Sequence, residues 1–176
     1  MTQAPGAAPA TTTGRWVPAY VALGSNLDDP PRQIERAFDA LRELRETRFE
    51  LRSPLYRSRP MGPVAQPDFV NAVAGLLTRL DAVALLHELK SLESRLGRAV
   101  PAVRWGPRLI DLDLLVHGST RIHEASIEVP HPGIAERAFV VVPLSEISPS
   151  LEIPGLGRVS ALLQRLDRSG LEWIQP

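Results

Sequence analysis

The hydrophobic pattern of the chain changes from a strand period to a helix period and back, and it does so twice. Residues 16–23 form an apolar β-type run, a helical segment opens at Pro30, and Phe49 and Leu51 then alternate with charged residues. Side chains three or four residues apart share a helix face, and side chains two residues apart share a strand face. The helical segment places its large apolar side chains on one face, at Ile34, Phe38 and Leu41. This part of the chain predicts a strand, a helix and a strand.

The same order returns between Phe69 and Val116. Phe69 to Thr78 is a mostly apolar strand, Asp81 can cap a helix, and Gly97 can end it. That helix has leucines on one face, at Leu85, Leu89, Leu92 and Leu96. The last strand alternates, with one face made of Ile110, Leu112, Leu114 and Val116. Two such units predict an α+β fold, in which we expect the helices to cover one face of the sheet.

Segments rich in proline and glycine separate these elements. Ser58 to Asp68 and Gly97 to Pro107 are predicted to be long loops, and loops of this length in a compact domain are usually functional or disordered. Beyond them we expect a loop at Val129–Pro132, a short segment from Phe139 to Ile147, and a helix from about Ser160 to Arg168.

Length and composition bound the organisation of the chain. With 176 residues and 44% hydrophobic content, the chain can bury one sizeable core. Residues 1–14 are small, contain proline and have almost no large apolar groups, so they predict a disordered N-terminal tail. The single domain is expected over residues 15–176.

The charge and cysteine content exclude several classes of function. The 20 basic and 20 acidic side chains balance, so no global field attracts nucleic acid or an anionic membrane. Without cysteine the chain has no disulfide, thiolate metal site or thiol nucleophile. The longest apolar runs are too short to span a bilayer, and no secretory signal is present. Together these observations predict a soluble cytoplasmic protein.

Two acids interrupt the apolar strand near residue 110. Asp111 and Asp113 lie at i and i+2, so they point the same way roughly 7 Å apart and can converge on a hard cation such as Mg²⁺. An exposed strand face also produces this pattern, but residues 104–108, Arg-Trp-Gly-Pro-Arg, lie directly upstream. Acids for a metal, arginines for phosphate oxygens and a nearby ring favour phosphoryl transfer. The glycine-rich phosphate loop and the protein-kinase motif set are both missing, so the predicted ATP site is of another kind.

The stretch from Arg104 to Leu115, RWGPRLIDLDLL, resembles the diagnostic segment of the 6-hydroxymethyl-7,8-dihydropterin pyrophosphokinases. Further similarity occurs in the family's order at residues 21–27, 66–72, 129–132 and 137–139, and the whole resemblance covers roughly residues 17 to 155. It implies a ferredoxin-like α+β sandwich with a mainly antiparallel sheet backed by helices. It also implies transfer of pyrophosphate from ATP to the pterin alcohol, giving AMP and the pterin pyrophosphate, a step of folate synthesis.

The resemblance also implies a role for particular side chains. Asp111 and Asp113 would bind two Mg²⁺ ions, and Arg98 and Arg108 would grip the phosphates of ATP. The other positions that match the nucleotide site are Glu93, Trp105, His131 and Arg137. The pterin would be held by Asn71 at its polar edge, by Phe69 and Phe139 on its two faces, and by the backbone from Ser58 to Met61. Without the motif, the two phenylalanines would be read as core residues, and Gly24–Ser25–Asn26 is expected to be a structural turn.

Two other functions remain open from the residues alone. A nucleotidyltransferase also pairs a Gly-Ser turn with a D-x-D strand, although Ser25 and Asp111 are far more widely spaced here than in such enzymes. A noncatalytic RNA-binding module also uses a ferredoxin-like sheet, but the chain has no aromatic RNA-binding run and no net positive charge.

Overall fold

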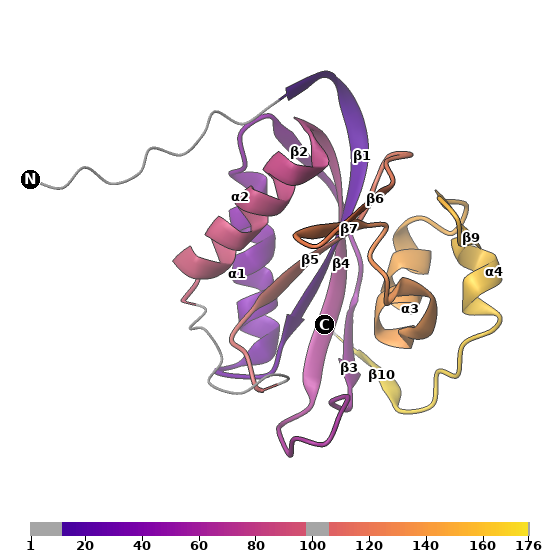
Figure 1. Cartoon of the computed structure of the whole chain (residues 1–176). Coiled ribbons are helices and arrows are strands. Elements are labelled where there is room, and N and C mark those ends of the chain that lie inside the picture. The colour runs from indigo at the N-terminus through magenta and orange to yellow at the C-terminus, as the bar shows by residue number, and fades with distance from the viewer. Residues whose placement is uncertain (1–11, 98–105, 176) are drawn as a thin grey trace, which may run out of the picture.

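A six-stranded sheet runs through the middle of the molecule with helices on both of its faces (Figure 1). A computed structural model describes residues 12–97 and 106–175. The sheet strands are β1 (Thr12–Ser25), β2 (Thr47–Arg52), β3 (Leu55–Ser58), β4 (Phe69–Leu80), β5 (Asp111–His117) and β10 (Leu171–Ile174). Four α-helices accompany them within these ranges: α1 (Pro30–Arg42), α2 (Ala82–Arg95), α3 (Ala138–Ile147) and α4 (Val159–Leu163). The mainly antiparallel α+β sheet that was predicted is confirmed.

Strands β1 and β4 form the centre of the sheet. The strand order is β10-β3-β4-β1-β5, every pair is antiparallel, and β2 also pairs with β4 beyond β3. Strand β5 is therefore the outer strand on one side. Smaller elements complete the described chain: hairpin β6 (Ile122–Glu124) with β7 (Ile127–Val129), hairpin β8 (Glu152–Ile153) with β9 (Gly157–Arg158), and the 3₁₀ turn η1 (Ile134–Glu136).

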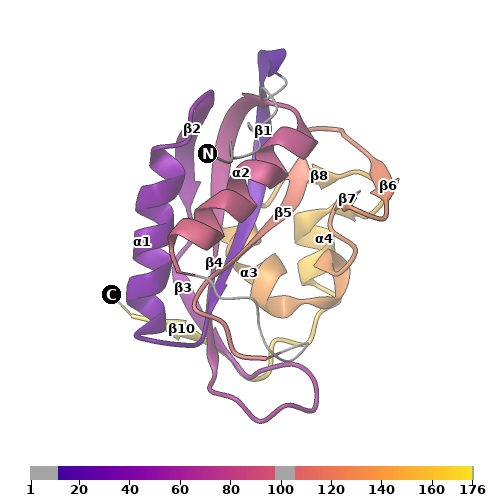
Figure 2. The same ribbon diagram turned by 60° about the vertical axis from the view of Figure 1, so that its left-hand side comes forward.

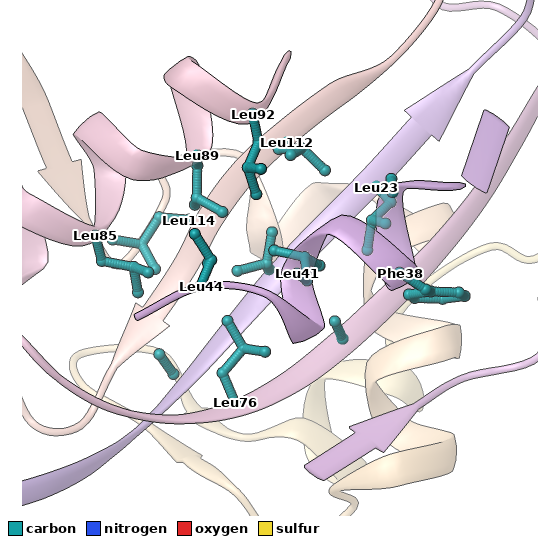
Figure 3. Close-up of a cluster of buried hydrophobic side chains, with 14 of the residues drawn as sticks. Leu23, Phe38, Leu41, Leu44, Leu76, Leu85, Leu89, Leu92, Leu112 and Leu114 are labelled. Atoms are coloured by element: carbon teal, nitrogen blue, oxygen red, sulfur yellow. The ribbon is translucent and has the colours of Figure 1, made fainter. Parts of the chain in front are cut away.

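Helices α1 and α2 lie side by side over one face of the sheet (Figures 1 and 2). The predicted apolar face of α1 is confirmed, because Ile34, Phe38 and Leu41 are fully buried. Helix α2 begins where the Asp81 carboxylate accepts a hydrogen bond from the Ala84 N–H at 2.8 Å. It ends before Gly97, whose φ of +95° is the left-handed conformation that glycine adopts readily. Figure 3 shows the leucines of α2 packed against Leu112 and Leu114 of β5.

The opposite face of the sheet is covered by α3 and α4. A second buried cluster joins Tyr20 and Val73 of the sheet to Val141 and Leu144 of α3 and Leu162 of α4. The prediction that helices cover only one face was therefore wrong. The central strands are apolar on both faces, and a sheet of that kind needs a cover on each side. Helix α4 is also shorter than the predicted Ser160–Arg168.

Strand β5 departs from the predicted clean alternation at its end. Leu112 and Leu114 pack in the cluster under α1 and α2, whereas Leu115 and Val116 both pack in the cluster under α3. The register with β1 shifts here, since Tyr20 pairs with Val116 while the next residue pairs with Leu114. A β-bulge at this point shifts the alternation by one residue, so that Val116 faces the side of the sheet opposite to Leu114. The face opposite Leu112 and Leu114 is the α3 side of the sheet, and there the two acids lie.

The ends of the described chain extend the sheet. Strand β1 begins at Thr12, inside the segment predicted as a tail, and residues 1–11 lie outside the described residues. Near the C-terminus, β10 pairs with β3. The sequence pattern did not predict β10. None of the helices in residues 12–97 and 106–175 combines the length and the apolar composition that crossing a bilayer requires.

Candidate active site

A cavity of about 290 Å³ opens on the α3 side of the sheet, at the end where β1 and β5 carry their polar residues. In both views the loop between β3 and β4 projects past this end of the sheet (Figures 1 and 2). The predicted site residues that line the cavity are Ser58, Met61, Phe69, Asn71, Arg108, Asp111, Asp113, His131, Arg137 and Phe139. They come from β3, β4, β5, α3 and the loops between these elements. The fold thus brings together residues that are far apart in the sequence.

Three predicted residues are not in this lining. Arg98 and Trp105 lie outside the described residues. Glu93 is described, but it is only 2% exposed and lies on α2, behind β5. Its carboxylate accepts hydrogen bonds from the Leu112 N–H at 2.6 Å and from the Lys90 ammonium at 2.9 Å.

The two strand acids are each matched with a cation. Arg108 Nη1 bonds to Asp111 Oδ2, and Lys90 Nζ lies 3.7 Å from Asp113 Oδ1. No cluster of three or more acidic or histidine metal ligands exists in residues 12–97 and 106–175. Protein magnesium sites commonly use one or two carboxylates and take the remaining ligands from water and substrate phosphates. The donor set of Asp111 and Asp113 fits such a site.

Lys90 is a cavity residue that the sequence analysis did not single out. It is the only lysine in the chain and lies three residues before Glu93 on α2. Its ammonium donates to Glu93 Oε1 and, at 3.0 Å, to the Leu112 carbonyl oxygen. Burial raises the pKa of the Glu93 carboxyl above its ordinary value, and the Lys90 charge and the Leu112 N–H act against this rise.

His131 is held as a neutral ring. Its backbone N–H donates to the Leu115 carbonyl at 2.9 Å, and its Nδ1 accepts a hydrogen bond from the Gly133 N–H at 3.0 Å. Burial lowers the pKa of His131, and the Asp113 carboxylate, which acts in the opposite direction, does not cancel this effect. Because Nδ1 accepts, the neutral ring carries its proton on Nε2, where it can donate to an anionic oxygen.

The other end of the cavity is suited to a flat ring. Asn71 is 5% exposed and donates through Nδ2 to Ser58 Oγ at 2.9 Å, which fixes the orientation of its amide. Phe69, at the start of β4, and Phe139, on α3, line the same space, and Met61 lies exposed at its mouth. Aromatic side chains with one buried amide favour a planar heterocycle with a polar edge.

Asn26 forms hydrogen bonds to the two loops that border the cavity. Its Nδ2 donates to Gln66 Oε1 at 3.0 Å and to the Pro67 carbonyl at 3.1 Å, in the loop before Phe69. Its Oδ1 accepts from the Arg108 N–H at 2.8 Å, and its own N–H donates to the Arg108 carbonyl at 3.1 Å. The prediction of a structural turn at Gly24–Ser25–Asn26 is consistent with these bonds, but the sequence pattern did not indicate that the turn joins both loops.

An α+β sheet whose cavity joins paired acids, positively charged side chains and an aromatic slot is typical of a phosphoryl-transfer enzyme with a heteroaromatic substrate. The model of the 7,8-dihydro-6-hydroxymethylpterin-pyrophosphokinase (HPPK) family matches residues 20–149. The chain belongs to this family. As a member it is a pyrophosphokinase of folate biosynthesis, a transferase that takes its diphosphate from ATP.

Individual proteins support the family assignment. The 2-amino-4-hydroxy-6-hydroxymethyldihydropteridine pyrophosphokinase of Pseudomonas aeruginosa is 45% identical over 153 residues, which are 87% of this chain and 94% of that protein. A folic acid synthesis protein of Schizosaccharomyces pombe is 37% identical over 136 residues, which are 77% of this chain and 18% of that protein. The wild-type Plasmodium falciparum HPPK-DHPS structure has a TM-score of 0.67 at 13% identity, over 86% of this chain and 45% of that chain, and this likeness concerns the fold alone.

Proposed function

We propose that this chain transfers the pyrophosphoryl group of ATP to the hydroxymethyl oxygen of 6-hydroxymethyl-7,8-dihydropterin through the cavity residues described above. The hydroxymethyl oxygen attacks the β-phosphorus, the bond from that phosphorus to the α-phosphate oxygen breaks, and AMP leaves. One observation carries the proposal: a single cavity is lined at one end by Asp111, Asp113 and Arg108, and at the other by Asn71, Phe69 and Phe139. These are the requirements of an anionic and a heteroaromatic substrate held together.

The phosphate end would act mainly by charge. Arg108 and Arg137 offer guanidinium groups to the phosphate oxygens, and His131 offers an uncharged N–H donor. Asp111 and Asp113 would hold two Mg²⁺ ions. When bound, these ions neutralise the triphosphate and lower the pKa of the hydroxymethyl group. Arg98 and Trp105 belong to the proposed nucleotide site on the strength of the family motif, although they lie outside the described residues.

The pterin end would act by orientation. Since Nδ2 of Asn71 donates to Ser58 Oγ and, at 3.4 Å, to the Tyr56 carbonyl, the amide oxygen is the group suited to accept from the pterin's polar edge. Phe69 and Phe139 would pack on the two ring faces, with the Ser58–Met61 backbone as the lip. A fixed ring places its hydroxymethyl group near the phosphate end, so the two reactants meet in one orientation.

The cellular context extends this proposal. A cytoplasmic location agrees with substrates of the folate pathway and with a sequence that has no cysteine. We also propose that the chain acts as a monomer. The zero net charge is unsuited to a nucleic-acid partner.

Identification of the nucleotide product tests the function. The purified chain is incubated with ATP, Mg²⁺ and 6-hydroxymethyl-7,8-dihydropterin, and the nucleotides are separated by chromatography. We expect AMP to form in equal amount to the pterin pyrophosphate, and only when the pterin is present. Release of free pyrophosphate with a nucleotide attached to the acceptor would instead indicate a nucleotidyltransferase, and binding without turnover would indicate a noncatalytic module.

A further inference from the structure

The outer edge of β5 is bound by two side chains of α2 at the residue between the two acids. Strand β5 ends the sheet on this side, so no further strand of residues 12–97 and 106–175 pairs with the outward groups of Leu112. The Leu112 N–H donates to Glu93 Oε1 at 2.6 Å, and the Leu112 carbonyl accepts from Lys90 Nζ at 3.0 Å. Two side chains, spaced i and i+3 on a helix, thus supply the hydrogen bonds that a neighbouring strand would supply.

These two bonds hold two successive peptide planes. The Leu112 N–H belongs to the plane that joins Asp111 to Leu112, and the Leu112 carbonyl belongs to the plane that joins Leu112 to Asp113. The direction in which each acid points depends on these planes, because successive side chains of a strand take their orientation from the pleated backbone. Fixing both planes therefore fixes one carboxylate relative to the other.

The two side chains are themselves fixed. Lys90 Nζ and Glu93 Oε1 are 2.9 Å apart, so the charges neutralise each other while each also holds Leu112. The helix that carries them is anchored to β5 by Leu85, Leu89 and Leu92, which pack against Leu112 and Leu114 (Figure 3). A buried carboxylate with a cation and a peptide N–H as partners is a rigid support, whereas a buried charge without partners is costly.

We propose that Lys90 and Glu93 form a backbone clamp on Leu112 that sets the spacing and direction of Asp111 and Asp113. Both are positioning residues that act through the strand, and Lys90 also lies 3.7 Å from Asp113 Oδ1, a direct contact that Glu93 does not share. The hydrogen bonds of the clamp lie within the chain, and its effect on magnesium rests on the proposed function of the two acids. Groups that orient metal ligands from behind typically contribute about 10- to 100-fold to metal affinity or activity.

The test compares Lys90→Met with two other variants. Methionine keeps an unbranched stem of similar length but removes the ammonium, and Lys90→Arg restores a cation. The matched control is Arg95→Met, which removes a positive charge from an exposed position of the same helix. Glu93→Gln provides a second way to weaken the clamp if Lys90→Met folds poorly.

The first readout is amide hydrogen exchange of the ligand-free protein. Glu93→Gln replaces the charged acceptor of the Leu112 N–H, and Lys90→Met removes the donor to the Leu112 carbonyl, whose peptide plane carries the Asp113 N–H. In each variant we expect the Leu112 and Asp113 amides to exchange about tenfold faster relative to the Leu23 amide, because the two peptide planes are held less firmly. Leu23, on β1, reports global stability, so the ratio separates local release from a general loss of stability. Lys90→Arg should restore most of the protection, and Arg95→Met should leave the ratio at the parent value.

The second readout is the magnesium dependence of AMP formation. We expect Lys90→Met to raise the Mg²⁺ concentration for half-maximal rate by about tenfold while the KM for the pterin stays unchanged. An unchanged exchange ratio with a raised KM for ATP would overturn the clamp, since Lys90 would then act on the nucleotide directly. Faster exchange without any change in magnesium dependence would also overturn it. If the parent protein forms no AMP, the proposed function fails, and the exchange result still decides whether the clamp on Leu112 exists.

Discussion

Asp111 and Asp113 place two carboxylates on one face of strand β5. Both point to the α3 side of the sheet, where Arg108 is paired with Asp111 and Lys90 with Asp113. Two carboxylates on one face repel each other unless cations lie between or beside them. The positive side chains around the acids therefore stabilise this face of the strand.

Replacing either acid should stop catalysis without unfolding the protein. For Asp111→Asn and Asp113→Asn we expect magnesium-dependent AMP formation to be abolished, since an amide is a poor ligand for a hard cation. The free energy of unfolding should change by less than about 1 kcal/mol, because each substitution also relieves repulsion on this face. Turnover assays and urea unfolding measure the two effects, with the exposed Asp39→Asn as control. Near-normal activity in either variant would falsify the metal assignment.

Asn71 gives a prediction that separates the two substrates. Asn71→Ala should weaken pterin binding by about 1–3 kcal/mol, the usual cost of losing one partner of a buried hydrogen bond, and should leave ATP binding nearly intact. Calorimetry with each ligand alone measures this. The control is Ser58→Ala, which removes the partner of Nδ2 but keeps the amide. Equal losses for both ligands in Asn71→Ala would show that the residue is structural.

Strand spacing predicted the two acids, the family resemblance implied the roles of the arginines and the aromatic slot, and the structure places the described ones around one cavity, apart from Glu93. The predicted roles still await the experiments above. Lys90 and Asn26 were not predicted, because each bonds to backbone groups far along the chain, those of Leu112 for Lys90 and of Arg108 and Pro67 for Asn26. A backbone group carries no residue identity, so a sequence pattern indicates such a bond only where it is local, as in the Asp81 cap.

At the scale of elements, Asn26 makes the turn after β1 a joint between two loops. One loop leads from Met61 to Phe69 at the aromatic end of the cavity, and the other leads through Arg108 to the acids. The side chain of Asn26 is 2% exposed, so its hydrogen bonds are not replaced readily by bonds to water.

Two substitutions of Asn26 should have different effects. Asn26→Ala removes both sets of bonds, and we expect weaker binding of the pterin and of ATP. Asn26→Asp keeps an acceptor for the Arg108 N–H but places a carboxylate against Gln66 Oε1 and the Pro67 carbonyl, so pterin binding should suffer more than ATP binding. Separate titrations of the two ligands compare the variants with Asn71→Ala. A loss confined to one ligand in Asn26→Ala would contradict the proposed joint.

Periodicity predicted the long elements well and the short ones poorly. The α1 face and both ends of α2 follow directly from apolar spacing, the Asp81 cap and Gly97. The bulge in β5 depends on its pairing with β1, and β10 is too short to show a pattern without β3 beside it. Helices on both faces were missed because α3 is apolar on most sides and contains Pro143, so it has no clear helical period.

At the scale of the whole molecule, the family match and the fold do not end together. The match covers residues 20–149, while the described structure continues through α4 and β10 to residue 175. The segment after residue 149 packs Val159 and Leu162 into the core under α3 and adds the strand beside β3. This part of the chain therefore belongs to the same folded unit as the family core.

The N-terminal segment is expected to be dispensable. We predict that deletion of residues 2–11 leaves the melting temperature and the turnover unchanged, because this stretch lacks the large apolar groups that docking requires. Differential scanning calorimetry and the AMP assay measure both quantities. As a comparison, deletion through Gly14 also removes the pairing of Thr12 with Leu80 at the start of β1. A melting temperature several degrees lower in the shorter deletion would mean that the segment packs on the domain.

The pairing of β10 with β3 affects how the protein folds during its synthesis. A ribosome makes the chain from its N-terminus, so β3 and the loop that carries Met61 emerge long before the partner strand of β3 has been synthesised. Until then β3 has an open edge, and such edges invite pairing with other chains. The free edge of β3 is therefore covered only after β10, far along the chain, has been synthesised. Slow translation of the segment after residue 149 would prolong the period in which the nascent chain can aggregate through this edge.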